Sequence, residues 1–191
     1  AAGDAMRRGH CGWTDDVHGV RAFVAVLALP PRILLLGAGP DAKPVCELAS
    51  FLGWRVTLAD HRAAYATPER FPGAEQVICA RPSDTTAVGD LSTFQAVVVM
   101  SHHVATDLGW LRSVARSDIP YVGLLGPAAR RERLMADLGE DAARVRGRLR
   151  APIGLDIGGR APESIALSIV AEIHAAIEGR TGSPFSWATN S

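Results

Sequence analysis

Short, mostly apolar runs alternate along the chain with segments in which apolar residues recur every three or four positions. Such runs are typical of strands buried on both faces of a parallel sheet, whereas the three-to-four spacing predicts amphipathic helices. The predicted strands are 33–36, 54–59, 76–79, 94–100 and 119–125, and the predicted helices are 40–52, 104–117, 128–139, 141–149 and 162–177. This alternation indicates an α/β fold of the doubly wound, Rossmann-like type, with a mostly parallel sheet and helices on both faces.

The segments outside this alternation lack sustained periodicity. Residues 22–29 are apolar, but acidic residues and Arg21 precede them and no small-residue cleavage site follows. We therefore expect a strand or packed segment leading into the sheet and not a signal peptide. A helical turn capped by Ser83 is predicted over 84–89, and a glycine-rich shaped loop over 151–159. The expected organisation is an N-terminal segment (1–20), one domain (21–178) and a C-terminal tail (179–191).

A glycine turn follows the first predicted strand. Gly37, Gly39 and Ala42 form a G-x-G-x-x-A pattern, and Pro40 suits a first helical turn, where its missing N–H has no partner to lose. In dinucleotide-binding folds the first glycine makes the tight turn, the second lets the backbone approach a pyrophosphate, and the helix N-terminus attracts phosphate. Asp60 closes the next strand, where its carboxylate would accept the ribose hydroxyls. The alternative is a turn that only connects two elements tightly.

Polar residues at the other strand ends are further candidates, because ligands of open α/β sheets bind beyond the carboxyl ends of the strands. His102 follows a central strand and Asp107 comes one helical turn later, so Asp107 would orient the imidazole against a pterin or phosphate. Helix capping is the competing explanation. Arg62 would meet a phosphate group, or else pair with Asp60.

The last predicted strand ends at Gly126, and the helix after it opens with Arg130 and Arg131. Cations at a helix N-terminus oppose the helix dipole, so an anionic ligand would explain both arginines better than stability does. A solvated charged face is the alternative. Trp54 and Trp110 are expected in the core. No Ser-His-Asp or Cys-His set and no carboxylate pair is placed for catalysis, so no catalytic residue is predicted.

Composition narrows the class of protein. The chain has 191 residues, 48% of them hydrophobic, and 20 basic residues balance 20 acidic ones. This balance argues against a nucleic-acid-binding or membrane-binding surface, and no apolar run approaches the length of a membrane span. The three cysteines are far apart, which fits a reducing compartment and predicts neither a disulfide framework nor a metal site. Cys46 is expected to be a small buried hydrophobe. A cytoplasmic protein is expected.

Taken jointly, the strand-end motifs resemble the Rossmann domain of the XdhC/CoxI family, the accessory factors of molybdenum hydroxylases such as xanthine dehydrogenase. The matching residues span about 21–178: Asp60-His61-Arg62, Ser101-His102 with Asp107, a Y-x-G-x-x-G element at Tyr121, Gly123 and Gly126, and Pro152–Leu155. Two positions depart from the family pattern. Residues 1–20 do not match the cysteine-containing N-terminal domain of full-length members, and Pro127 stands where a serine is usual.

The resemblance implies a maturation factor and not an enzyme. Such a protein binds the molybdenum cofactor (molybdopterin), protects it during sulfuration by a cysteine desulfurase, and helps to insert it into an apo-hydroxylase; a homodimer would be compatible with this role. The implied cofactor-binding residues are Gly37, Gly39, Pro40, Asp60, Arg62, His102, Asp107, Gly126, Arg130 and Arg131. The glycine turn and Asp60 alone would also suit an NAD(P)-dependent oxidoreductase or an S-adenosylmethionine-dependent methyltransferase.

Overall fold

The structure, a computed structural model, describes residues 12–14, 22–25 and 27–184, and it divides between Pro30 and Pro31 into two units. In the first unit, β1 (Gly12–Thr14) pairs antiparallel with β2 (Ala22–Val24). Trp13 and Phe23 face each other across this pair, with ring centroids 5.4 Å apart in an edge-to-face arrangement. A strand was one of the two alternatives predicted for 22–29; it covers Ala22–Val24 and pairs within a two-stranded sheet, separate from the main one.

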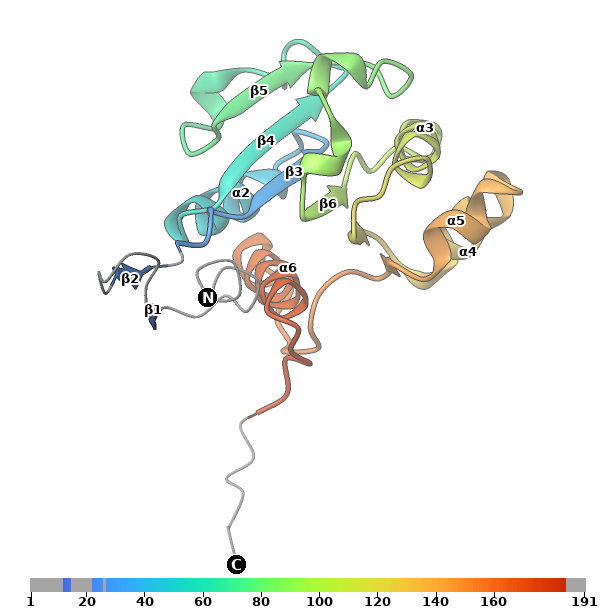
Figure 1. Ribbon diagram of the computed structural model, residues 1–191. Helices are drawn as coiled ribbons and strands as arrows, with labels where there is room; N and C mark the ends of the chain where they lie inside the picture. Colours follow the sequence, from blue (N-terminus) through green and yellow to red (C-terminus); the bar gives the residue numbers. More distant parts are fainter. Residues whose placement is uncertain (1–11, 15–21, 26, 185–191) are drawn as a thin grey trace, which may run out of the picture. The chain divides into compact units, whose positions relative to one another are not determined.

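The second unit is built on a parallel sheet of six strands (Figure 1). Each neighbouring pair of strands is parallel, and the order is β5-β4-β3-β6-β7-β8. Their bounds are β3 (Arg32–Leu36), β4 (Arg55–Asp60), β5 (Gln76–Cys79), β6 (Ala96–Val99), β7 (Tyr121–Leu124) and β8 (Leu149–Arg150). Leu36 pairs with both Ala59 and Val99. The carboxyl ends of β3, β4 and β6 therefore meet at one edge of the sheet.

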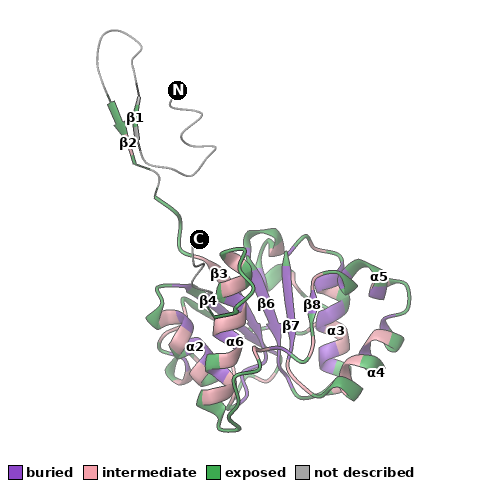
Figure 2. Ribbon diagram, turned by 90° about the horizontal axis from the view of Figure 1, so that it is seen from below, coloured by how far each residue is buried: buried purple, intermediate pink, exposed green. Residues whose placement is uncertain are grey.

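Helices cover both faces of this sheet, as predicted. One face carries α2 (Ala42–Phe51) and α6 (Pro162–Ile177), and the other carries α3 (Val104–Ala115), α4 (Ala128–Leu138) and α5 (Asp141–Arg146) (Figure 2). Because both faces are covered, the central strands are apolar throughout, and Ile33, Leu34, Leu35 and Leu36 are almost wholly buried. Trp54 and Trp110 lie in the core as expected.

Helix α2 packs through the apolar stripe that its sequence predicted. Val45, Cys46 and Ala49 are buried, and burial raises the pKa of the Cys46 thiol to about 11. Gly53 follows the helix with φ +77°, a left-handed conformation that favours glycine after a helix C-terminus. The helix begins at Ala42, so Pro40 lies in the turn before it and not in its first turn.

Two local predictions were right about the type of element and wrong in detail. The helix predicted over 141–149 ends at Arg146, and the chain then forms β8, a two-residue strand too short to show a period of its own. The turn after Ser83 is a 3₁₀ helix over Thr86–Val88, preceded by Thr85 with no side-chain cap among the described residues. The glycine-rich segment 151–159 contains no helix or strand, as predicted.

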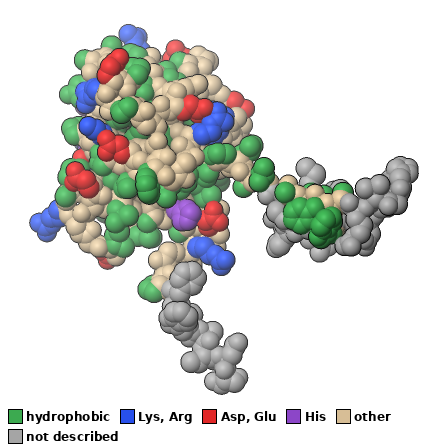
Figure 3. Space-filling model, turned by 90° about the vertical axis from the view of Figure 1, so that its left-hand side faces the viewer, with side chains coloured by type: hydrophobic (Ala, Val, Ile, Leu, Met, Phe, Trp, Pro, Cys, Tyr) green, Lys and Arg blue, Asp and Glu red, His purple; other side chains and the backbone are tan. Residues whose placement is uncertain are grey.

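The described surface mixes both charge signs. On the face drawn in Figure 3, basic and acidic side chains are interspersed with apolar ones, as the balanced composition suggests. None of the helices in the described part of the chain combines the length and the apolar character that crossing a bilayer would require.

Candidate functional site

The glycine turn after β3 is fixed by close backbone packing. Gly37 has φ +130°, and a Cβ added there would lie 2.7 Å from the carbonyl carbon of Met100 and 2.8 Å from the amide nitrogen of Ser101. Its own N–H donates to Ala59 O at 2.8 Å. Only glycine fits both this conformation and this approach, so the first glycine of the motif ties β3 to the ends of β4 and β6.

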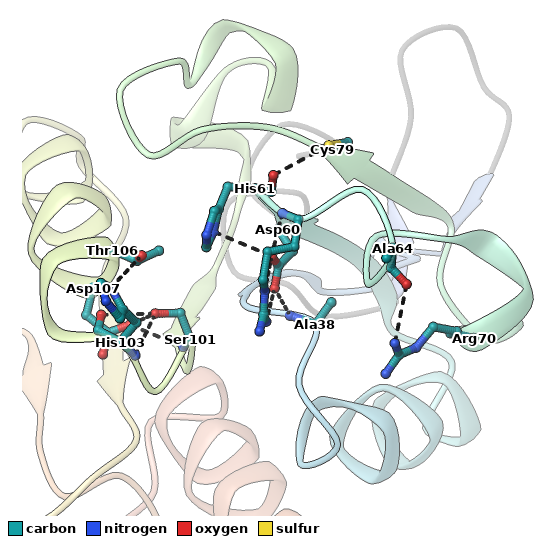
Figure 4. A network of polar contacts seen from close by, with 11 residues as sticks. Ala38, Asp60, His61, Ala64, Arg70, Cys79, Ser101, His103, Thr106 and Asp107 are labelled. Atoms are coloured by element: carbon teal, nitrogen blue, oxygen red, sulfur yellow. Dashed lines mark hydrogen bonds and ion pairs between the residues drawn. The ribbon is translucent and has the colours of Figure 1, made fainter.

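Asp60, at the end of β4, points at the glycine turn (Figure 4). Its carboxylate is 1% exposed and accepts hydrogen bonds from Ala38 N (2.7 Å), Arg62 N (2.8 Å), Arg62 Nε (2.9 Å) and Arg62 Nη2 (2.7 Å). Four donors occupy the lone pairs of both oxygens. Asp60 therefore holds the glycine turn against β4, and its carboxylate is not free for a ribose.

Arg62 completes this arrangement. Its guanidinium pairs with Asp60, as one of the two sequence-based alternatives proposed, and lies 3.8 Å from the centroid of the Tyr65 ring. The Asp60 and Arg62 charges cancel at the strand end. A ligand at this edge therefore meets a neutral pair and not a free cation.

Replacing Asp60 with asparagine is expected to lower the free energy of unfolding by about 1–2 kcal/mol at pH 7, because a charge-assisted hydrogen-bond set is lost. Burial by itself would raise the pKa of Asp60, but hydrogen bonds from the Arg62 side chain and from the Ala38 and Arg62 backbone outweigh it and hold the pKa below its usual range. A carboxyl with a lowered folded-state pKa contributes stability that is complete above its unfolded pKa of about 3.9 and is lost as the pH falls through the folded-state pKa.

Urea unfolding of both proteins between pH 3 and pH 7 measures this contribution. The difference between wild type and Asp60→Asn should be largest at neutral pH and shrink at the acid end. A difference that stays constant over this range would show that the ionised carboxylate of Asp60 does not stabilise the fold.

His102 lies beside the glycine turn and is the third residue after the end of β6. Its φ is +59°, the only positive value for a non-glycine residue among the described residues, and such a left-handed conformation costs about 1–2 kcal/mol. The imidazole is half exposed, with Nε2 3.0 Å from Asp41 Oδ2, and its Cδ2 would lie 3.7 Å from a Cβ at Gly39. The strained backbone thus places a titratable ring against the second glycine of the motif.

Asp107 has a different role from the one predicted. It is fully buried in α3, accepts hydrogen bonds from the Ser101 backbone N–H (3.1 Å) and hydroxyl, and pairs with the Arg130 guanidinium, whose Nε is 3.0 Å from Oδ2 (Figure 4 shows the Ser101 side). It does not orient His102, whose acidic partner is Asp41. The prediction was wrong because the imidazole, on a left-handed backbone, pairs with Asp41 directly before α2.

Gly126 makes the Asp107–Arg130 pair sterically possible. Its φ is +141°, and a Cβ there would lie 2.6 Å from Cδ of Arg130, so the arginine stem crosses the glycine on its way to Asp107. The guanidinium of Arg130 is therefore held by a buried carboxylate. An anionic ligand is not needed to explain this arginine.

The starts of two helices remain open at the same edge. Within the described residues, no side chain caps the N-terminus of α3 or α4, so first-turn N–H groups there are left to attract an anion. The first turn of α2 offers none, because Ala42 N and Lys43 N donate to backbone oxygens and the next residue is Pro44. Arg131, half-buried in the first turn of α4, has no hydrogen bond or ion pair from its side chain among those residues. The neighbouring His103 does not join this open edge: its Nδ1 lies 3.1 Å from the hydroxyl of Thr106, within hydrogen-bond distance.

The sequence-predicted residues thus separate into two groups. Asp60, Arg62, Asp107, Gly126 and Arg130 hold the strand ends in place, whereas Gly39, Pro40, His102 and Arg131 border the open edge. Asp41, the partner of His102, was missed, although an acid directly after G-A-G-P at a helix start was a visible signal. No cluster of three metal-ligating side chains occurs in the described part of the chain.

The fold and this edge define a Rossmann-type domain whose strand ends are braced by buried carboxylate–arginine pairs. Residues 33–173 match the XdhC Rossmann domain. The chain belongs to the XdhC family. Over 151 residues it is 36% identical to a Bacillus subtilis protein named as a probable xanthine dehydrogenase subunit, and the match covers 79% of this chain and 44% of that protein. It is 27% identical over 154 residues to the uncharacterized protein YqeB of Escherichia coli, covering 79% and 28%.

A solved structure shows the same similarity in three dimensions. The crystal structure described as a xanthine dehydrogenase from Bacillus halodurans superposes with a TM-score of 0.70 at 31% identity, covering 83% of this chain and 46% of that one. The chain therefore spans less than half the length of each of these relatives.

Proposed function

We propose that this chain acts in the maturation of a molybdenum hydroxylase of the xanthine dehydrogenase type, by binding the molybdenum cofactor at the carboxyl edge of its sheet. The observation that carries the proposal is membership of the XdhC family together with an edge built for an anion. In this role the bound cofactor receives its sulfur from a cysteine desulfurase and then passes to the apo-hydroxylase. The partners would be those two enzymes.

The residues present fit a phosphorylated pterin. The uncapped starts of α3 and α4 suit the phosphate, as does Arg131, whose side chain has no partner among the described residues, since N–H groups and a guanidinium both bind phosphate oxygens. The imidazole of His102 stands at the glycine turn, where it can hydrogen-bond a heteroaromatic ring or a phosphate oxygen. When bound, the cofactor supplies the metal and its dithiolene sulfurs. The protein residues bind it, orient it and exclude water.

The buried state of Asp60 weighs against an NAD(P)-dependent oxidoreductase. In dinucleotide-binding domains an acid at this position accepts the ribose hydroxyls, but here the carboxylate already accepts from Ala38 and Arg62. The same argument applies to the ribose of S-adenosylmethionine. A pterin cofactor makes no demand on that carboxylate.

Binding measurements on matched variants test the proposal. Molybdenum cofactor, NAD, NADP and S-adenosylmethionine would each be titrated against the wild type, His102→Asn and Arg131→Gln. Asparagine tolerates the left-handed backbone of position 102, so the first variant removes the imidazole with little added strain. Arg133→Gln is the control, because Arg133 lies on the same helix but is 69% exposed and 3.9 Å from Asp137.

We expect the wild type to bind the molybdenum cofactor and each site variant to bind it about tenfold or more weakly, the loss of a charge-assisted hydrogen bond. A saturating ligand at about 100 times its Kd would also stabilise the fold by about 2.7 kcal/mol. Tight binding of NAD or S-adenosylmethionine without binding of the molybdenum cofactor would refute the proposal. Equal affinities in all three variants would refute the site.

A further inference from the structure

A cavity of about 710 Å³ opens beside the strand edge between the end of β4, the loop after β5 and one side of α3. None of its lining residues belongs to the group bordering the glycine turn. Its size falls in the range of small-molecule sites, about 300–1,000 Å³. Figure 4 shows His61 leaving the end of β4 toward the side of α3 that carries Thr106, two residues that line this cavity.

Helix α3 presents a polar stripe to this cavity in addition to its apolar face. Thr106, Gly109 and Ser113 recur at the helical spacing of three and four, and Arg116 follows directly after the helix. An apolar helix face would be expected if this side simply packed on the loop after β5. Small residues leave room there.

The loop after β5 is held at a fixed distance from this stripe. A Cβ at Gly109 would lie 2.7 Å from Cβ of Pro82, so the glycine permits the close approach. The hydroxyl of Ser113 donates to Pro82 O at 2.9 Å. The walls of the cavity are therefore joined by direct contact and are already formed.

Positive charge converges on the cavity. Arg81, Arg112 and Arg116 line it together with His61, and no acidic residue is in the lining. Arg116 is partly neutralised by Asp141 at 3.5 Å, and Arg112 donates only to a backbone oxygen, Asp137 O.

The remaining groups around the cavity add little negative charge. Arg81 is exposed, with no side-chain partner in the described part of the chain. Asp60, which faces His61 at 3.5 Å, is already paired with Arg62.

We propose that this cavity binds the phosphate or diphosphate group of a small phosphorylated molecule. Guanidinium groups present planar sets of donors that match phosphate oxygens, and several arginines around one cavity are typical of such sites. The hydroxyl of Ser83 supplies a further donor. The lining contains no Phe, Tyr or Trp side chain for a base to stack on, so recognition rests on the anionic group. The proposal does not rest on the function proposed above.

Titration with inorganic pyrophosphate tests the proposal on the full chain. Saturable binding is expected in the wild type by calorimetry at low salt, weakened about tenfold or more in Arg112→Gln and further in Arg81→Gln/Arg112→Gln. Arg133→Gln, with its guanidinium outside the lining, should bind like the wild type. Equal affinities in the double variant and this control, or no saturable binding to wild type, would overturn the proposal.

Gly39→Ala separates two sources of the phosphate. If pyrophosphate affinity is unchanged in that variant, the cavity serves a free phosphorylated molecule, whereas a loss of affinity assigns it to a ligand that also occupies the glycine turn. Binding of the molybdenum cofactor at the glycine turn is measured separately. The result for the cavity therefore does not depend on the result for the cofactor.

Discussion

Replacing Asp107 with alanine is expected to lower the free energy of unfolding by about 3–5 kcal/mol, the cost of leaving a buried charge without its partner. Arg130 is 16% exposed and its guanidinium is directed at the fully buried Asp107 across Gly126. The variant also leaves the Ser101 amide without its acceptor and the Ser101 hydroxyl with only the longer bond to His103 O. Chemical unfolding of the purified proteins measures the change.

A double-mutant cycle separates the ion pair from simple loss of packing. Asp107→Leu/Arg130→Met removes both charges. Its loss in free energy of unfolding should be well below the sum of the losses in the two single variants, because neither charge is then left buried without its partner. Arg133→Gln breaks an exposed pair on the same helix and should cost at most about 0.5 kcal/mol. If Asp107→Ala costs no more than that control, the pair does not hold the strand ends.

Replacing Gly37 with alanine is expected to cost more than about 3 kcal/mol and to prevent folding if the protein is only marginally stable. The new methyl group would lie 2.7 Å from the Met100 carbonyl, and the backbone at φ +130° excludes alanine even without that contact. The backbone of Met100 and Ser101, directly after β6, cannot move aside without disturbing its pairing with β3. Circular dichroism and thermal unfolding record the outcome.

The second glycine provides the matched comparison. A Cβ at Gly39 meets nothing closer than the His102 ring at 3.7 Å, an ordinary contact, and its φ is not positive. Gly39→Ala should therefore keep the stability within about 1 kcal/mol while weakening ligand binding, because the methyl group keeps a phosphate away from the backbone. Equal destabilisation by both substitutions would contradict this division between the two glycines.

The arrangement of strands and helices could be predicted from the sequence because burial on both faces leaves an uninterrupted apolar run. The run 33–36 is such a strand, and the apolar stripe of α2 shows the helical spacing of three and four. Helix α6 matched its predicted bounds, Pro162–Ile177. Strand β8 could not be predicted, since two residues carry no period and its pairing with β7 is decided by tertiary contacts.

The candidate site was predicted less completely. The motif placed Gly37, Asp60 and His102 at one edge, but spacing alone gave no information on which charges pair. Arg130 reaches Asp107 from 23 positions away because Gly126 lets its stem pass, a contact without local signature. The basic cavity was missed for the same reason, since Arg81 and Arg112 come from separate elements.

Mass spectrometry of the ligand released from this protein, purified from a host supplied with molybdenum, tests the proposed function most directly. The proposal predicts a molybdopterin species in the wild type, at a level reduced in His102→Asn and unchanged in Arg133→Gln. Recovery of NAD or S-adenosylmethionine in its place, or no pterin in a host that makes the cofactor, would contradict it.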